Sequence, residues 1–128
     1  MRPWIGKFIG GIGVVHTLFG LLGFRGQLAM WLGEGLWNTV NGQAEREFPF
    51  WFLSFGILAI IFGLFVDWVE RHFGELPRFL GWSFLGLTVA VVVIMPISGG
   101  WLMFAPAVGA IRRASRSRSG SERGRAGV

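Results

Sequence analysis

Phe48–Val69, with the sequence FPFWFLSFGILAIIFGLFVDWV, is the stretch that decides the fold of this chain. As a helix, its roughly 22 residues would cross the hydrocarbon core of a bilayer, which is about 30 Å thick. Asp67 is its one ionisable residue and lies near its far end. The stretch is therefore predicted to be a membrane-spanning helix, and the chain to be a membrane protein.

The composition of the whole chain agrees with that prediction. Of the 128 residues, 52% are hydrophobic, with seven Trp and thirteen Phe. The formal net charge is +5, but half of the twelve basic residues follow Ile111, so the positive charge belongs mainly to the C-terminal end. The absence of cysteine excludes disulfides, thiol catalysis and thiolate metal sites.

Three further stretches are apolar enough to be spans. The first is predicted over residues 4–24, the third over 79–95, and a short fourth over 100–111, after a break at Pro96–Gly100. A signal peptide is the competing interpretation of 4–24, but the run is long and no small-residue cleavage site follows it. Residues 112–128 are predicted to form a disordered basic cytoplasmic tail.

The connection between the first two spans is also patterned. Apolar residues fall on one helical face between residues 26 and 40, which predicts a short amphipathic helix on the membrane surface. An ordinary loop helix that covers the mouth of the bundle would give the same pattern. The expected fold is thus an all-α bundle of four transmembrane helices over residues 1–111, with an amphipathic helix between helices 1 and 2.

Basic residues set the expected orientation. Arg2 and Lys7 lie at the first end of the first span, and four arginines, at positions 112, 113, 116 and 118, follow the last span. Both termini are therefore predicted to be cytoplasmic, which requires an even number of crossings. Four spans meet that requirement.

Small residues recur at helical spacing on the first two spans. Such faces allow two helix backbones to approach closely, so the two spans are predicted to pack together, although glycine is common in membrane helices in general. The residues assigned to helix packing are Gly6, Gly10, Gly13, Gly20, Gly56 and Gly63.

Three ionisable residues lie inside the two longest spans: Lys7, His16 and Asp67. Lys7 is close enough to the end of its span to reach the membrane surface. An intramembrane histidine normally faces protein or water, so His16 either serves a function, such as proton transfer or ligand contact, or bonds to a neighbouring helix. Asp67 precedes Arg71 by one helical turn and is expected to form an ion pair with it. No spacing fits a metal site or predicts a cofactor.

Several short motifs allow a family resemblance to be stated. The chain resembles an uncharacterised family of small bacterial four-helix integral membrane proteins, which are similar in layout to DoxX-like proteins. The resemblance covers roughly residues 4–111 and implies a bacterial inner-membrane location, without any established activity. The residues that carry it are Gly13-x-x-His16-Thr17-x-Phe19-Gly20, Glu34-Gly35-Leu36-Trp37-Asn38, Phe50-Trp51-Phe52-x-x-Phe55-Gly56, Asp67 and Met95-Pro96-x-Ser98-Gly99.

Three functions remain open at this point. The first is a binding or accessory module in which His16, Asn38, Asn41 and Trp51 line a pocket for a lipid-like or quinone-like ligand or a partner subunit. The second is a small membrane enzyme or proton-coupled carrier that uses His16 as acid and base. The third is a structural subunit of a larger complex, as a homo-oligomer or with a partner membrane protein. Membrane lipids are the expected surroundings, and no nucleic-acid partner is expected.

Overall fold

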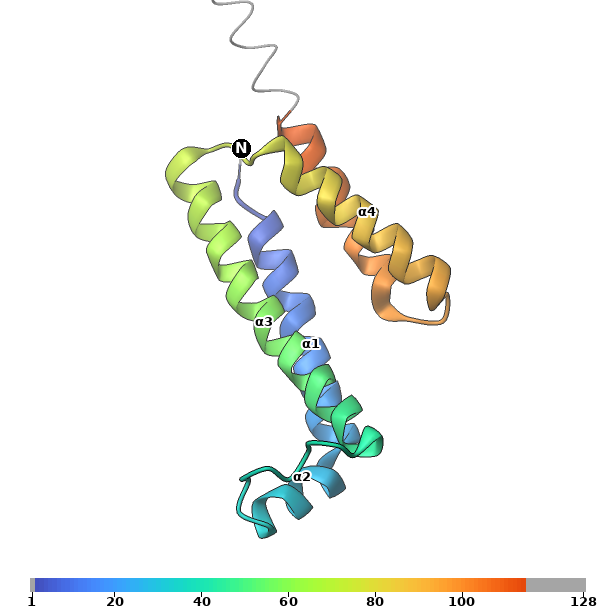
Figure 1. Ribbon diagram of the computed structural model, residues 1–128. Coiled ribbons are helices and arrows are strands. Elements are labelled where there is room, and N and C mark those ends of the chain that lie inside the picture. The colour runs from blue at the N-terminus through green and yellow to red at the C-terminus, as the bar shows by residue number, and fades with distance from the viewer. Residues whose placement is uncertain (1, 115–128) are drawn as a thin grey trace, which may run out of the picture.

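Helices make up all the regular structure in residues 2–114, the part of the chain that the computed structural model describes (Figure 1). The all-α prediction is therefore confirmed. In chain order the elements are α1 (Ile5–Gly23), α2 (Arg25–Gly33), α3 (Ala44–Phe73), α4 (Arg78–Ile94) and the 3-10 helix η1 (Gly99–Met103), after which residues 104–114 form a further helix.

The first hairpin pairs α1 with α3 along two glycine faces. A Cβ atom added to Gly13 would lie 2.7 Å from the backbone nitrogen of Ile60, and one added to Gly20 would lie 2.7 Å from Leu53 Cδ2. Real Cβ atoms essentially never come that close to another atom, so a side chain at Gly13 would require the α3 backbone to move, and one at Gly20 would require the Leu53 side chain to move. Buried residues recur every seven positions on each helix, so one face of each helix stays turned toward the other. They are Gly6, Gly13 and Gly20 on α1, and Pro49, Gly56, Gly63 and Glu70 on α3.

The second hairpin pairs α4 with helix 104–114. A Cβ atom on Gly81 would lie 2.8 Å from the backbone nitrogen of Ile111, so this pair also meets at a glycine. Figure 1 shows the two hairpins close together at the end where the chain begins and apart toward the other end. We call the end where the two hairpins lie close together the closed end. The main cluster of buried apolar residues lies there and joins both hairpins; its members are Ile5, Ile9, Val66, Leu76 and Ala110.

The connection after α1 differs from the prediction. The helix predicted over 26–40 ends at Gly33, because Gly35 adopts a left-handed conformation with φ of 87°. The Leu36 N–H then bonds to the Trp31 carbonyl and the Gly35 N–H to the Leu32 carbonyl, an arrangement that ends helices by satisfying their last carbonyls. The rest of the predicted helix is a loop.

The bounds of two later helices also differ from the prediction. α3 begins at Ala44 rather than near Phe48, so Pro49 lies inside it and the acidic Glu45 and Glu47 occupy its first turn, where the helix dipole favours negative charge. Helix 104–114 runs past Ile111, so residues 112–114, which were assigned to the disordered tail, are helical. Residues 115–128 of the predicted tail lie outside the described residues.

In the part of the chain that the structure describes, two helices are long and apolar enough to cross a membrane, α1 and α3. Only 28% of the most apolar window of α1 and 22% of that of α3 is buried, whereas the core helix of a soluble protein would be mostly buried. α4 is also apolar but has 17 residues, and helix 104–114 is shorter still. Residues 2–114 thus contain two candidate spans by length and composition, and the predicted bundle of four spans is not confirmed.

Candidate functional site

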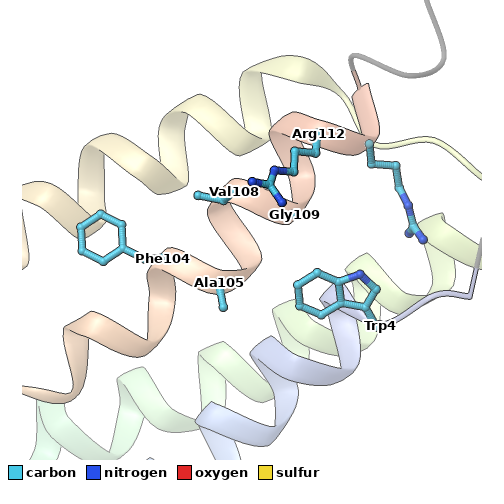
Figure 2. A pocket seen from close by; sticks show the side chains of 7 residues that line it. Trp4, Phe104, Ala105, Val108, Gly109 and Arg112 are labelled. Carbon is cyan, nitrogen blue, oxygen red and sulfur yellow. The ribbon is translucent and has the colours of Figure 1, made fainter.

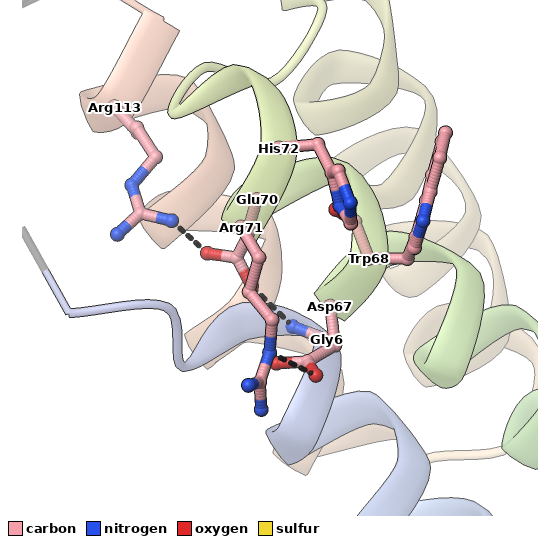
Figure 3. A network of polar contacts seen from close by, with 7 residues as sticks. All are labelled: Gly6, Asp67, Trp68, Glu70, Arg71, His72 and Arg113. Carbon is pink, nitrogen blue, oxygen red and sulfur yellow. Dashed lines mark hydrogen bonds and ion pairs between the residues drawn. The ribbon is translucent and has the colours of Figure 1, made fainter.

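A buried carboxylate, Glu70, lies at the closed end of the two hairpins (Figure 3). It continues the seven-residue repeat of α3, so it points toward the start of α1 in the same way as Gly63 one repeat earlier. Its Oε2 atom accepts a hydrogen bond of 2.8 Å from the Gly6 backbone N–H. That amide lies in the first turn of α1, where backbone N–H groups have no helical partner and favour an anion.

The second oxygen of Glu70 binds Arg113, on the last turn of helix 104–114. The Arg113 Nη1 group donates to Glu70 Oε1, and its Nη2 group donates to the Arg2 carbonyl at 2.8 Å. Both side chains are almost fully buried. A buried ion pair is tolerated only when its remaining hydrogen-bonding groups are also satisfied, as they are here. The pair therefore ties the first hairpin to the second.

Asp67, one turn earlier on α3, forms a separate and more exposed ion pair. Arg71 Nε donates to Asp67 Oδ2 at 2.8 Å, in the i,i+4 geometry that the sequence spacing predicts. The other oxygen, Oδ1, is buried and has no hydrogen-bond partner among the described residues. Nearby, His72 stacks at a tilt on Trp68, with ring centroids 4.6 Å apart, and its Nδ1 atom lies 2.9 Å from the Trp68 carbonyl.

A pocket of about 550 Å³ lies beside this network, between the start of α1 and helix 104–114 (Figure 2). The Trp4 indole packs against helix 104–114 at Gly109, whose missing side chain leaves room for the ring, and it forms one wall of the pocket. The two arginines lie at one end and the apolar residues extend away from them. The lining consists of Trp4, Phe104, Ala105, Val108, Gly109, Arg112 and Arg113. Such a pocket fits a molecule that is apolar along most of its length and polar at one end.

None of the predicted ligand-binding residues lines this pocket. His16 lies between α1 and α3, where its ring stacks on Phe52 with centroids 3.9 Å apart and its Nε2 atom donates to the Phe52 carbonyl at 3.1 Å. Asn38, Asn41 and Trp51 are exposed. Within residues 2–114, no hydrogen bond or ring contact joins any of these three to His16.

His16 therefore serves the packing of α1 on α3 in this structure. A carbonyl can only accept, so Nε2 must carry a proton, and a neutral imidazole meets that requirement. Thr17, the next residue, turns its hydroxyl to the Gly13 carbonyl at 2.8 Å and lies against Gly56. The polar groups of this helix face are thus satisfied by backbone carbonyls, that of Phe52 on α3 for His16 and that of Gly13 on α1 itself for Thr17.

Sequence reasoning missed both members of the buried ion pair. Glu70 lies just beyond the second predicted span, 48–69, and Arg113 falls in the predicted disordered tail, 112–128. Two signals were available: Pro49, Gly56 and Gly63 repeat every seven residues up to Glu70, and the buried Ala107, Ala110 and Ala114 repeat at three and four residues. The second repeat extends the helical face beyond Ile111 and through Arg113.

No group of three or more metal-binding side chains is found among residues 2–114. The site offers a guanidinium end, an apolar wall and a fixed ion pair, which together suit the binding of a ligand.

Comparison with known proteins gives a family but no activity. The chain belongs to a family of unknown function (DUF6463), whose match covers residues 1–117. No curated protein and no solved structure matches it.

Proposed function

Starting from a family of unknown function, we propose that this chain is a small multi-pass membrane protein that binds a lipid-like molecule between its two helical hairpins. The observation that carries the proposal is the pocket between Trp4 and helix 104–114, with its apolar wall and its polar end. This site replaces the one predicted around His16.

The exposed surfaces support a membrane location with four crossings. Large apolar side chains are exposed along α1, α3 and α4, including Phe19, Leu64 and Val93. In water such a surface would cause association, whereas in a bilayer it faces lipid tails. Basic residues outnumber carboxylates at the closed end of the two hairpins. This excess of positive charge favours a cytoplasmic position for that end.

The pocket runs from a polar end to an apolar end in the same direction as a lipid of the cytoplasmic leaflet runs from its headgroup to its chain. Arg112 and Arg113 lie on the last turn of helix 104–114, at the closed end, and Phe104 and Ala105 lie about two turns away toward the middle of the molecule. A lipid headgroup would then lie at the cytoplasmic surface, and its chain would follow the apolar wall into the bilayer.

Mass spectrometry of the full chain after extraction in a mild detergent tests the proposal. We expect a lipid or a similar apolar molecule to remain bound to the wild-type protein. Ala105→Trp would place an indole in the pocket and should release that molecule. Ala90→Trp is the matched control, because Ala90 is an exposed alanine on α4 that does not line the pocket.

Two results would contradict the proposal. One is a wild-type protein that retains no molecule beyond a loose detergent shell. The other is equal retention by the Ala105→Trp and Ala90→Trp variants, which would place the bound molecule elsewhere on the apolar surface. Including quinones among the molecules searched for covers the other ligand class predicted from the sequence.

A further inference from the structure

We infer that the pocket selects a lipid with an anionic, phosphate-type headgroup, and that Arg112 is the residue that binds it. This inference rests on the proposed function and names the chemistry of its ligand. It does not follow from the pocket being apolar, since a neutral lipid would also fit an apolar wall.

The charges around the pocket lead to this assignment. Its lining contains two guanidinium groups and no carboxylate. The charge of Arg113 is already balanced, because its guanidinium is bound to Glu70 and to the Arg2 carbonyl. Arg112 is exposed and makes no hydrogen bond or ion pair within residues 2–114. Among the described residues, the pocket therefore carries one positive charge, that of Arg112, that no carboxylate balances.

The position of Arg112 matches that of a headgroup. Its side chain lies along helix 104–114 beside Val108 and Gly109, as Figure 2 shows, so its charge is at the edge of the apolar wall. A guanidinium group presents paired N–H donors whose geometry fits the oxygens of a phosphate. The adjacent Glu70–Arg113 pair holds the last turn of the helix in place, so Arg112 is positioned before the ligand arrives.

Competition between two phospholipids tests the inference on the full-length protein. The protein is reconstituted in nanodiscs of phosphatidylcholine with or without phosphatidylglycerol, and the lipids that stay bound after transfer to detergent are counted by native mass spectrometry. We expect the wild type to retain phosphatidylglycerol preferentially. Arg112→Ala should reduce that preference about tenfold, as expected for loss of one charge-assisted contact, while neutral lipid is still retained.

Two variants serve as controls. Arg78→Ala removes the same charge from an exposed position near the same end of the molecule but outside the pocket, so it should leave the preference unchanged. Arg112→Lys keeps the charge but loses the paired donors, so its preference should fall between those of the wild type and Arg112→Ala.

Each outcome decides the matter. Retention of lipid without preference for phosphatidylglycerol would overturn the inference and leave the proposed function standing, and retention of no lipid would overturn both. Equal losses in Arg112→Ala and Arg78→Ala would show general surface attraction instead of a site. If inorganic phosphate alone raised the melting temperature of the wild type but not of Arg112→Ala, and displaced phosphatidylglycerol, the ligand would be a free oxyanion and not a lipid.

Discussion

At the scale of single residues, Glu70 and Arg113 determine how the two hairpins meet. Both side chains are nearly inaccessible to solvent, so each charge is stabilised by the other residue and not by water. Such a pair contributes little net stability compared with an apolar pair of the same shape, but removal of one member leaves a buried charge without compensation. The main effect of the pair is thus to specify how α3 and helix 104–114 meet at the closed end, and its contribution to net stability is small.

We predict that Arg113→Ala and Glu70→Ala each lower the free energy of unfolding by about 3–5 kcal/mol. The double variant Glu70→Met/Arg113→Met should recover much of that loss, because it buries no charge. Unfolding in mixed micelles with increasing dodecyl sulfate measures all three, with Arg78→Ala as the exposed arginine control. Single variants no less stable than this control would contradict the buried position of the pair.

His16 is a second polar side chain that needs a partner within the protein. A histidine inside an apolar helix left two interpretations open, a function such as proton transfer or a bond to a neighbouring helix, and in the structure His16 donates to the Phe52 carbonyl and stacks on the Phe52 ring. Sequence could single out the residue, because an imidazole in a span needs a protein partner. It could not identify the partner, because Phe52 is 36 residues away and offers a backbone atom.

At the scale of the elements, glycines decide which helices pair. The glycine face of α1 packs against the glycine face of α3. These two faces therefore need no partner from another protein. This weakens the interpretation of the chain as a structural subunit that joins a complex through those faces. The pairing could be predicted from sequence because helical spacing alone brings such glycines to one face.

Gly13 and Gly11 offer a matched test of this pairing. An added methyl group at Gly13 would meet the backbone of α3, whereas nothing lies within 4 Å of the same group at Gly11. We predict that Gly13→Ala lowers the free energy of unfolding by about 1–3 kcal/mol through overpacking. Gly11→Ala should raise it slightly, since alanine favours helix more than glycine. Thermal melts followed by circular dichroism compare the two, and equal melting temperatures would contradict the close approach at Gly13.

The loop after α2 is held by an ion pair that depends on pH. Arg46 donates to both carboxylate oxygens of Glu34, at 2.6 and 3.0 Å, and to the Thr39 carbonyl at 2.8 Å. The hydrogen bond from Arg46 lowers the pKa of Glu34 below its usual value. Ionised Glu34 therefore stabilises the folded loop fully when the pH is above the usual pKa of a glutamate. This stabilisation is lost as the pH falls through the lower pKa that Glu34 has in the folded protein.

Hydrogen exchange of the peptide that contains the loop measures this effect. At neutral pH we expect faster exchange in Glu34→Gln than in the wild type, by a modest factor because the pair is exposed to solvent. The difference should shrink and vanish as the pH is lowered below the folded pKa of Glu34, since the wild-type side chain is then neutral as well. A difference that persists unchanged in acid would show that the glutamine acts through something other than lost charge.

At the scale of the whole molecule, the lengths of the two hairpins differ. α3 has 30 residues and is about 45 Å long, whereas α4 has 17 and is about 25 Å long, a few ångströms less than the hydrocarbon core. The tip of the second hairpin is apolar, and Ile97 within it is fully exposed. Composition could locate these helices but not their register against the bilayer, because Arg112 and Arg113 lie within helix 104–114 and blur the boundary between its apolar part and the basic sequence.

Two topologies place both termini on the same side of the membrane. In one, the second hairpin crosses fully and its tip reaches the far surface; in the other, it enters and returns. We predict full crossing, because unpaired backbone at the tip would be costly within the hydrocarbon region and a small local thinning of the bilayer costs less. The chain has no native cysteine, so single cysteines can report on each position.

A membrane-impermeant maleimide applied to intact cells separates the two topologies. Asn41→Cys, in the outer loop, should be labelled from outside, and Glu75→Cys, in the turn between the hairpins, only after the membrane is permeabilised. Gly99→Cys decides the question; an added side chain there meets nothing within 4 Å, so the substitution leaves the tip intact. Labelling of Gly99→Cys like Asn41→Cys supports four crossings. Labelling only after permeabilisation would leave α1 and α3 as the two spans and the second hairpin as a re-entrant pair.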